Sequence, residues 1–343
     1  MRLSYKKIGA QTVRLLTAPS VVSFAAVGGK MESQGPLGAC FDELNTDCFW
    51  GEKTWEKAES AMQKRALTLA LEKGGLAASD LDVVFAGDLL NQCIGSSFSL
   101  RSFGIPFYGL YGACSTMGEG LSLAAMLLDG GFAHRAAALT SSHFCTAERQ
   151  YRMPVPYGSQ RTPTAQWTAT ASGCCILSEH GSGPYITHIT AGKIVDLGVT
   201  DAANMGAAMA PAAYDTLSAL FRDTETKPSD YDLIVTGDLG ALGQRIVTDL
   251  FARDGVDLTK NYTDCGLLLY DRKAQDMHCG GSGCGCSAGV LCGFLLRSMR
   301  AGRWKRIVFA PTGALLSPTS TFQGESIPGI CHAVVISETR EGL

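Results

Sequence analysis

A ten-residue segment that occurs twice places the strongest constraint on the fold of this 343-residue chain. Residues 80–89 read DLDVVFAGDL and residues 230–239 read DYDLIVTGDL, so five of the ten positions are identical. In each copy a short apolar run ends in Gly-Asp, which predicts a buried strand that presents a carboxylate, Asp88 or Asp238, at its carboxyl end. The copies lie 150 positions apart, far beyond the period of a solenoid, so we expect two similar halves.

Helix-like segments flank both copies in the same order. One segment with helical spacing of apolar residues precedes each copy, and a second, glycine-led segment follows it and runs into an apolar strand. The helical segments are residues 55–73, 118–135, 212–222 and 289–306, and the strands after the glycine-led segments are residues 136–139 and 307–310. A helix that feeds a strand in both halves predicts an α/β fold whose sheets are covered by helices on both faces.

The junction of the two halves is expected between residues 178 and 198. Residues 181–184 read GSGP, which is a turn signal, and residues 185–189 have the pattern of a strand. We therefore divide the chain into an N-terminal extension with the first strands (residues 1–55), an N-terminal half (residues 56–190) and a C-terminal half (residues 191–343).

Composition excludes several classes of function. The 29 basic and 32 acidic residues give a formal net charge of -3, too little to hold nucleic acid or an anionic membrane surface through a general field. No uninterrupted apolar run reaches the roughly 18 residues of a membrane-spanning helix, and the N-terminus lacks the features of a signal peptide. We expect a cytoplasmic protein in which most of the 13 cysteines are reduced and buried.

Cys114 stands directly before the glycine-led helix of the first half, in the sequence YGACSTMG (residues 111–118). A thiol at that point meets the positive end of the helix dipole, which favours the thiolate and lowers the pKa of the cysteine. The motif is equally compatible with a small buried cysteine at a tight strand-to-helix turn. Cys114 is therefore a candidate nucleophile, with a structural role as the alternative.

A glycine-rich segment, CGGSGCGCS (residues 279–287), precedes the matching helix of the second half. Even with the neighbouring His278, it lacks the paired Cys-x-x-Cys spacing of structural zinc sites, so we predict no metal. It also lacks the lysine of a P-loop and the spacing of a dinucleotide-binding motif, so we predict no nucleotide cofactor. Its backbone amides, at a helix N-terminus, suit an oxyanion or a carboxylate.

A third cluster of polar residues includes His143, Arg149 and Arg152, interleaved with aromatic residues up to Trp167. Three prolines between residues 154 and 163 predict that this segment is a loop. Arginine forks suit carboxylates, and aromatic faces suit a flat ring. A solvated or subunit-facing loop is the alternative for any single arginine.

Together these features resemble the thiolase superfamily, which includes the β-ketoacyl carrier-protein synthases. The resemblance rests on GACS at residues 112–115, on the duplicated α/β halves and on the glycine-rich segment of the second half. It implies a thiolase-like α/β fold with duplicated five-stranded mixed sheets in αβαβα layers. It also implies a homodimer.

Longer strings resemble one family in particular, the stage V sporulation protein AD family, over residues 35–330. These strings are GDLLNQ (87–92), YGACST (111–116), AERQYR (147–152), MGAAMAPAA (205–213) and GSGCGCS (281–287). The resemblance implies a protein of the SpoVA complex that binds dipicolinic acid (pyridine-2,6-dicarboxylate) without catalysis and is needed for dipicolinate uptake into the developing spore. It further implies integral membrane SpoVA proteins as partners, calcium as a candidate companion of the ligand, and a peripheral location at the spore inner membrane.

The residues at the expected catalytic positions are consistent with a protein that has lost the catalytic activity of the superfamily. A condensing enzyme of the thiolase type needs, besides its cysteine, two histidines or a histidine and an asparagine from the second half. Where the first histidine would stand this chain has Asp238, and where the second group would stand it has residues 281–284. Neither His278 nor His332 falls on those positions, so acyl transfer should be slowed by several powers of ten.

The pocket implied by this resemblance would hold its ligand with helix-terminal amides and a few charged side chains. The predicted ligand-binding residues are Cys114, Ser115, Thr116, His143, Arg149, Arg152, Asp238, Gly281, Ser282, Gly283, Cys284, Thr312 and Gly313. Two other functions stay open: an acyltransferase that uses Cys114 with a partner such as His143, and a scaffold whose pocket is vestigial.

The repeated aspartates, Asp88 and Asp238, have three interpretations. Each carboxylate could face the pocket, bind the calcium that accompanies dipicolinate, or cap the helix that follows. We favour helix capping for both residues, because aspartate is a good N-cap at any strand-to-helix turn.

Overall fold

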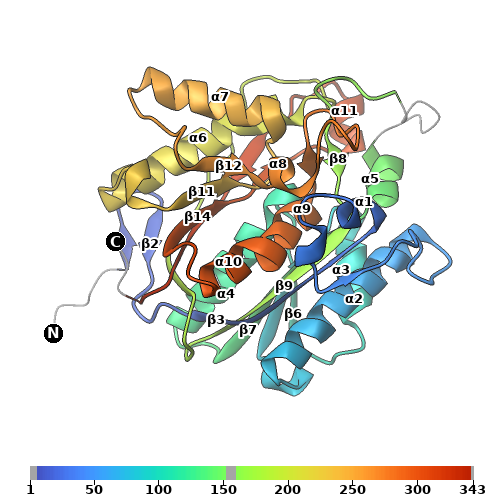
Figure 1. Cartoon of the computed structure of the whole chain (residues 1–343), viewed down its shortest axis with the longest axis vertical. Coiled ribbons are helices and arrows are strands. Elements are labelled where there is room, and N and C mark those ends of the chain that lie inside the picture. The colour runs from blue at the N-terminus through green and yellow to red at the C-terminus, as the bar shows by residue number, and fades with distance from the viewer. Residues whose placement is uncertain (1–5, 152–159, 341–343) are drawn as a thin grey trace.

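The computed structural model describes residues 6–151 and 160–340 (Figure 1). Ten strands form one hydrogen-bonded path that consists of two five-stranded sets, β6-β5-β7-β9-β3 and β12-β11-β14-β17-β10. In each set the first three strands are parallel, and the last two add in antiparallel fashion. The two halves of the chain therefore have the same topology, as the sequence repeat predicts.

The strand bounds follow the repeat closely. In the N-terminal set they are β3 (Ser20–Gly28), β5 (Val83–Gly87), β6 (Phe107–Gly109), β7 (Arg135–Ser142) and β9 (Ala171–Ser178). In the C-terminal set they are β10 (Tyr185–Thr190), β11 (Leu233–Thr236), β12 (Tyr262–Asp264), β14 (Arg306–Ala310) and β17 (Ala333–Ser337). Shorter strands are β1 (Lys7–Ile8), β2 (Thr12–Arg14), β4 (Glu43–Leu44), β8 (Trp167–Thr168), β13 (Gly281–Ser282), β15 (Thr312–Ala314) and β16 (Gly329–Cys331).

The two sets meet at one edge through the residue pair Tyr185 and Ser20, which connects β10 with β3. The predicted five-stranded sheets are present, but this contact joins them into one larger mixed sheet. Strand β10, which was expected at the junction of the halves, pairs along its length with β17 and so lies in the C-terminal set.

Helices cover both sets of strands. They are α1 (Lys30–Ser33), α2 (Trp55–Gly74), α3 (Ile94–Leu100), α4 (Thr116–Asp129), α5 (Phe144–Tyr151), α6 (Met205–Thr224), α7 (Gly240–Arg253), α8 (Cys265–Leu269), α9 (Cys284–Val290), α10 (Leu296–Arg300) and α11 (Pro318–Phe322). A π-helical segment, Leu291–Leu295, connects α9 with α10. Among the described residues, no helix has the combination of length and apolar character that crossing a bilayer requires.

Three hydrophobic clusters separate the layers. Along β5, Val84 and Ala86 belong to an outer cluster with α2, whereas Phe85 belongs to the central cluster with α4. Along β11, Ile234 belongs to a second outer cluster with α6, whereas Val235 faces the same central cluster. This alternation places one helical layer between the two sets of strands and one outside each (Figure 1). The αβαβα layers that the sequence predicts are therefore confirmed.

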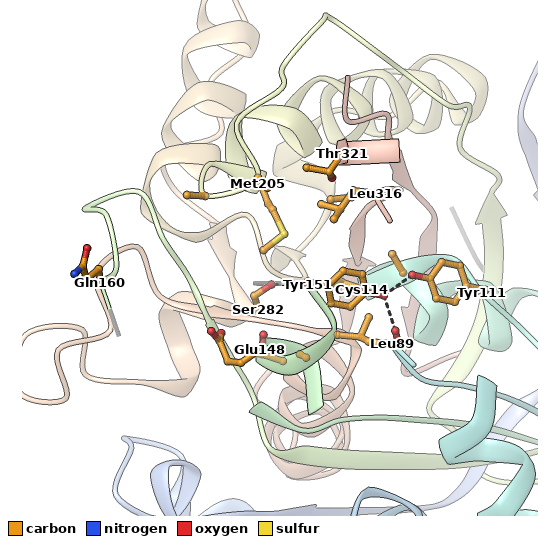
Figure 2. Close-up of a pocket in the computed structure, with 16 residues that line it drawn as sticks. Leu89, Tyr111, Cys114, Glu148, Tyr151, Gln160, Met205, Ser282, Leu316 and Thr321 are labelled. Carbon is orange, nitrogen blue, oxygen red and sulfur yellow. Dashed lines mark hydrogen bonds between the residues drawn. The ribbon is translucent and has the colours of Figure 1, made fainter. Parts of the chain in front are cut away.

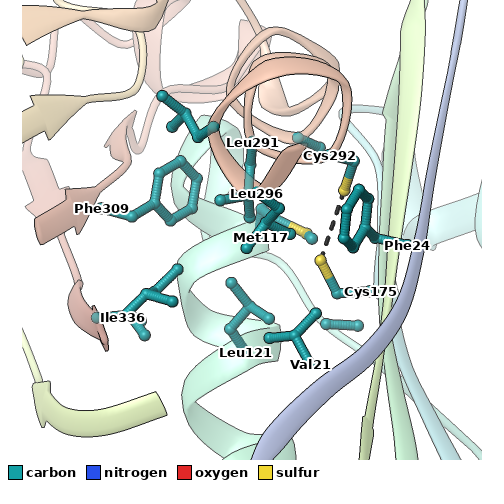
Figure 3. Packing of buried hydrophobic residues seen from close by; sticks show 14 of the residues in the cluster. Val21, Phe24, Met117, Leu121, Cys175, Leu291, Cys292, Leu296, Phe309 and Ile336 are labelled. Atoms are coloured by element: carbon teal, nitrogen blue, oxygen red, sulfur yellow. Dashed lines mark hydrogen bonds between the residues drawn. The ribbon is translucent and has the colours of Figure 1, made fainter. Parts of the chain in front are cut away.

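The central cluster packs α4 and the α9–α10 segment against both sets of strands (Figure 3). Met117 and Leu121 of α4 and Phe309 of β14 are fully buried, and burial of each such side chain contributes about 1.5–3 kcal/mol. Close approach of α9 to the sheet requires a glycine at position 173, where a Cβ would lie 2.5 Å from the Ala288 carbonyl oxygen.

Three segments differ from the sequence prediction. Helix α6 begins at Met205, seven residues before the predicted start, and includes Pro211. Helix α9 begins at Cys284, inside the segment that we expected to be a glycine-rich loop. Residues 144–151 form helix α5 instead of a loop, since the prolines that suggested a loop all follow it. The Nδ1 atom of His143 accepts a hydrogen bond from the Cys145 amide at the start of α5.

Candidate functional site

A cavity of about 320 Å³ lies between the two halves of the chain. Side chains from the ends of strands, from α5 and from the starts of α4 and α6 converge on it (Figure 2). The residues that line it are Leu89, Tyr111, Ala113, Cys114, Ala147, Glu148, Tyr151, Gln160, Thr168, Ala202, Ala203, Met205, Ser282, Ala314, Leu316 and Thr321. Of the predicted ligand-binding residues that the structure describes, two line this cavity: Cys114 and Ser282.

Cys114 lies in a short 3-10 turn, Ala113–Ser115, that runs directly into α4. Ala113 has a positive φ of 50°, and this left-handed conformation makes the turn sharp enough to present the next side chain to the cavity. Cys114 as a whole residue is 6% exposed, and its Sγ atom lies 3.9 Å from Oγ of Ser282. The cysteine of the first half and the glycine-rich segment of the second half therefore meet, as the resemblance to thiolases implies.

The predicted low pKa of Cys114 is wrong. Burial raises the pKa of this thiol well above its usual value, and the nearby Asp238 carboxylate and Cys284 thiol raise it further. Loss of hydration and a neighbouring negative charge both disfavour a thiolate, and together they outweigh the positive end of the α4 dipole. Cys114 is consequently a protonated thiol at neutral pH.

Asp238 follows β11 and lies behind Cys114 and Ser282, with no exposed surface. Its Oδ2 atom accepts hydrogen bonds from Ser282 Oγ at 3.0 Å and from the Gly283 amide at 3.3 Å. Its Oδ1 atom accepts one from Thr312 Oγ1 at 2.8 Å. Burial raises the pKa of this carboxyl to about 7, and the charge of Asp264 adds to the increase. The hydrogen bonds that the carboxylate accepts lower its pKa, but they do not offset the effect of burial.

Asp238 is not a helix cap, so that prediction is wrong for this residue. The carboxylate of Asp264, at the end of β12, accepts hydrogen bonds from the Leu239 and Gly240 amides at the start of α7, at 2.9 and 3.0 Å. These amides are already satisfied, which leaves the Asp238 side chain free to turn toward the cavity wall.

For Asp88 the capping prediction is confirmed. Its Oδ2 atom accepts hydrogen bonds from the amide and the hydroxyl of Ser96, in the first turn of α3, at 2.7 and 2.6 Å. Its Oδ1 atom accepts one from the Leu90 amide at 3.0 Å. Burial raises the pKa of Asp88, and burial together with the charge of Asp88 raises the pKa of the nearby Glu59 to about 8.

The glycine-rich segment uses its own backbone amides internally. The Gly283 amide donates to Asp238, and the Gly285 amide donates to Oγ of Ser142 at 3.0 Å. The Cys284 thiol is buried and donates to the Ser141 carbonyl oxygen at 2.9 Å. At Gly281 a Cβ would lie 3.0 Å from the Cys286 sulfur, so this residue allows close packing. Ser282 is the predicted ligand residue of this segment that lines the cavity.

Four other predicted ligand residues, Ser115, Thr116, Thr312 and Gly313, lie around the turn that carries Cys114. The Ser115 hydroxyl donates to the Gly112 carbonyl at 2.6 Å, and the Thr116 hydroxyl donates to the Ala113 carbonyl at 2.6 Å. Thr312 bonds to Asp238, and Gly313 lies so close that a Cβ would be 2.3 Å from the Gly112 carbonyl oxygen. These residues lie behind the lining of the cavity.

His143 and Arg149 point away from the cavity. Nε2 of His143 is 2.8 Å from the Cys48 carbonyl oxygen, and burial lowers the pKa of this histidine. Arg149 forms an ion pair with Glu56, and its guanidinium lies 5.4 Å from the centre of the Trp55 ring. Arg152 lies outside the described residues.

Two tyrosines that sequence reasoning did not select form one wall of the cavity. The Tyr151 hydroxyl donates to the Leu89 carbonyl oxygen at 2.5 Å, and the Tyr111 hydroxyl lies 2.8 Å from it (Figure 2). The Gln150 side chain also donates to the Leu89 carbonyl, at 2.8 Å. These residues belong to three of the strings that carry the family resemblance, and that membership was the signal that could have identified them.

The chemistry of the cavity is mainly apolar and neutral. Glu148 is an acidic residue in its lining, and the lining residues that the structure describes include no lysine, arginine or histidine. Within the described part of the chain, no group of three or more His, Cys, Asp or Glu side chains is arranged to hold a metal ion. The thirteen cysteines are all free thiols, nine of them buried, in agreement with the sequence prediction.

Comparison with known proteins gives a family match over almost the whole chain. The model of the family described as stage V sporulation protein AD matches residues 9–337. Stage V sporulation protein AD of Bacillus subtilis (strain 168) is 45% identical over 315 residues, which cover 92% of this chain and 93% of that protein.

Solved structures of similar fold include a 3-oxoacyl-[acyl-carrier-protein] synthase III and OleA. The 3-oxoacyl-[acyl-carrier-protein] synthase III of Aquifex aeolicus VF5 has a TM-score of 0.57 and 12% identity, with 93% of this chain and 99% of that chain covered. A crystal structure of OleA from Xanthomonas campestris has a TM-score of 0.59 and 12% identity, with 96% and 99% covered. At this level of identity the likeness establishes the thiolase-like fold.

Proposed function

This chain belongs to the stage V sporulation protein AD family, and from that premise we propose that it binds dipicolinic acid during sporulation without catalysing a reaction. In this proposal it acts in the SpoVA complex with integral membrane proteins, lies peripherally at the spore inner membrane and supports dipicolinate uptake into the developing spore.

The observation that carries the proposal is the surroundings of Cys114. A condensing enzyme activates its cysteine with a neighbouring base and stabilises the oxyanion with two donors. Here burial and the Asp238 carboxylate raise the pKa of the Cys114 thiol, and the hydroxyl of Ser282 lies 3.9 Å from its Sγ atom. A protonated thiol beside a carboxyl group supports a receptor more than a catalyst.

The shape of the cavity supports a small flat ligand. Its volume of about 320 Å³ is at the lower end of the range for small-molecule sites. Met205 and Leu316 lie across the cavity from the ring of Tyr151 (Figure 2), so a pyridine ring would find apolar faces. Ser282, Thr168 and Thr321 offer hydroxyl groups to its carboxylates.

A homodimer is part of the proposal. Strand β6 is the outer edge of the N-terminal set, and all three of its residues, Phe107 to Gly109, are exposed. An exposed apolar edge strand is a template for pairing with a second copy. Sedimentation equilibrium of the native chain and of Tyr108→Lys tests this, since a monomeric native chain would contradict it.

Isothermal titration with dipicolinate tests the proposal directly. We expect saturable binding, with affinity reduced several-fold in Ser282→Ala and Leu316→Asp, because both side chains line the cavity. Arg149→Ala is the matched control, since its guanidinium pairs with Glu56 outside the cavity, and it should bind like the native chain. Absence of binding to the native chain, with or without calcium, would refute the proposal.

An acyltransferase remains the second candidate, because Cys114 does line the cavity and Asp238 beside it has a pKa of about 7. Incubation with acyl-coenzyme A followed by intact-mass measurement separates the two. A stable acyl adduct that disappears in Cys114→Ser would favour the enzyme, and an unmodified chain would favour the receptor.

A further inference from the structure

Asp238 is a buried acid whose hydrogen bonds all come from neutral groups. The donors are the Ser282 and Thr312 hydroxyls, the Gly283 amide and the Cys114 thiol. A buried carboxylate without a cationic partner is costly, and neutral donors offset part of that cost. The group therefore holds a proton more firmly than an exposed aspartate.

Within the described residues, the titratable groups that act on Asp238 are one acid and several thiols on neighbouring elements, and none of these groups carries a positive charge. Asp264 lies at the end of β12 and raises the pKa of Asp238. The charge of Asp238 in turn raises the pKa of thiols on the turn before α4, on α8, on α9 and on β16. These thiols are Cys114, Cys265, Cys284, Cys286 and Cys331.

Ser282 connects Asp238 to the cavity. Its hydroxyl now donates to Asp238 Oδ2 at 3.0 Å, so its proton points away from a ligand although the residue lines the cavity. When Oδ2 carries a proton, the carboxyl group becomes the donor and Ser282 Oγ the acceptor. The Ser282 proton is then released to donate to a ligand carboxylate in the cavity.

We propose that the cavity takes up one proton together with its anionic ligand, and that Asp238 holds this proton while Ser282 turns its hydroxyl to the ligand. This inference rests on the proposed function, because it requires an anionic ligand in this cavity. A buffer acid or hydronium supplies the proton: its bond to that proton breaks, one O–H bond forms at Oδ2 of Asp238, and no bond between heavy atoms changes.

Two physical effects support the coupling. A dianion over Cys114 and Ser282 would repel an ionised Asp238 across a medium that screens poorly, and protonation removes that repulsion. Protonation also converts Ser282 from a group occupied by Asp238 into a donor for the ligand. Since burial raises the pKa of Asp238 to about 7, the proton is exchanged near neutral pH.

Titration calorimetry of the full chain with dipicolinate, repeated at pH 7 in buffers of different ionisation enthalpy, measures the protons taken up. We expect about half a proton per ligand at pH 7, and an affinity that falls up to about tenfold per pH unit above pH 7. The side chain of Asp238→Asn cannot gain or lose a proton in this range, so binding should persist with no proton uptake and no pH dependence.

Two further variants make the result specific. Asp88→Asn changes the equivalent residue of the other half, whose carboxylate bonds to Ser96 instead of the cavity wall, and it should take up protons like the native chain. Glu148→Gln tests the acid in the cavity lining. Loss of proton uptake in Glu148→Gln with uptake retained in Asp238→Asn would overturn the assignment to Asp238.

The outcomes also separate this inference from the proposed function. Binding of dipicolinate without any dependence on the buffer's ionisation enthalpy would overturn the proton coupling and leave the receptor function intact. No binding at pH 6, 7 or 8 would overturn both.

Discussion

Asp88 and Asp238 occupy equivalent positions in the two halves, yet their carboxylates bind different groups. Asp88 accepts hydrogen bonds from the first turn of α3, whereas Asp238 accepts them from Ser282 and Thr312 beside the cavity. The two strands that carry them have the same neighbours in the same order. Local sequence and strand topology therefore do not explain the difference.

The next strand explains it. In the C-terminal half Thr236 of β11 pairs with Asp264 of β12, and in the N-terminal half the corresponding pair is Ala86 with Gly109. The Asp264 carboxylate accepts hydrogen bonds from the Leu239, Gly240 and Gly266 amides at 2.9, 3.0 and 3.0 Å and from the Thr236 hydroxyl at 2.7 Å.

Gly109 has no side chain with which to do the same, so Asp88 itself must bond to the helix amides of its half. A second acid on the neighbouring strand thus released Asp238 from capping and made it available to the cavity. The comparison teaches that a duplicated residue can change its role when a residue on an adjacent strand takes over its hydrogen bonds.

Of the substitutions that test this difference between the halves, Asp264→Ala should reduce stability the most. It leaves three buried amides without their acceptor, so we expect the free energy of unfolding to fall by about 3 kcal/mol or more, measured by urea denaturation. Asp249→Ala is the control, because its carboxylate is exposed and forms a surface pair with Arg245; its effect should stay below about 0.5 kcal/mol. A loss below 1 kcal/mol in Asp264→Ala would mean that Asp264 does not replace Asp238 as the cap.

Asp88→Ala should have the next largest effect. It removes the acceptor for the Leu90 and Ser96 amides, so we expect unfolding free energy to fall by about 2 kcal/mol. Dipicolinate affinity should stay within about twofold of native in the folded protein, since the loss of a remote cap changes no cavity contact. Lost binding with unchanged thermal stability would show that Asp88, too, serves the cavity.

The reactivity of Cys114 tests whether the Asp238 carboxylate acts on the neighbouring thiol. Because burial and Asp238 raise the pKa of this thiol, iodoacetamide at pH 8 should modify the exposed Cys48 well before Cys114. Asp238→Asn removes the negative charge that helps to raise the pKa of Cys114, so it should accelerate alkylation of Cys114 several-fold. Peptide mapping by mass spectrometry measures both rates, and equal Cys114 rates in native and variant chains would contradict the electrostatic coupling.

The buried Glu59, whose pKa is raised partly by Asp88, should make the stability of the protein depend on pH. Burial and Asp88 raise its pKa from 4.5 to about 8, so the folded state keeps a proton that the unfolded chain releases. The resulting stability is present in full below pH 4.5 and is lost as the pH rises through 8, with a slope of up to about 1.4 kcal/mol per pH unit.

In Glu59→Gln no proton can be released, so the decline in unfolding free energy from pH 6 to pH 8 should be shallower by about 1 kcal/mol per pH unit. Denaturation curves collected at pH 6, 7 and 8 measure this slope. Parallel pH profiles for the native chain and the variant would show that Glu59 is ionised in the folded state.

Much of the fold could be predicted from local patterns. The repeat predicted the strands after residues 80 and 230, and these strands have the same neighbours in both halves. The glycine-led helices, the layers and the meeting of Cys114 with Ser282 also follow from the sequence and its family resemblance. Each of these predictions depends on periodicity or on a motif within a short stretch of chain.

The chemistry of the site was less predictable. Arg149 was expected at the ligand, but it forms an ion pair with Glu56, 93 positions earlier. The pKa of Cys114 was expected to fall, but it rises because the fold buries the thiol and places an acid from the other half, Asp238, next to it. In both cases the deciding partner is distant in the sequence, and no local pattern indicates it.

The sequence by itself determined the family, the duplicated α/β topology and the position of Cys114 at the start of a helix, because these depend on residue order and hydrophobic periodicity. Only the tertiary structure decided which of the two aspartates caps its helix: Asp88 does, whereas Asp238 bonds to Ser282 of the cavity wall. The physical reason is the register of β11 with β12, which brings the Asp264 carboxylate to the amides that Asp238 would otherwise have to satisfy.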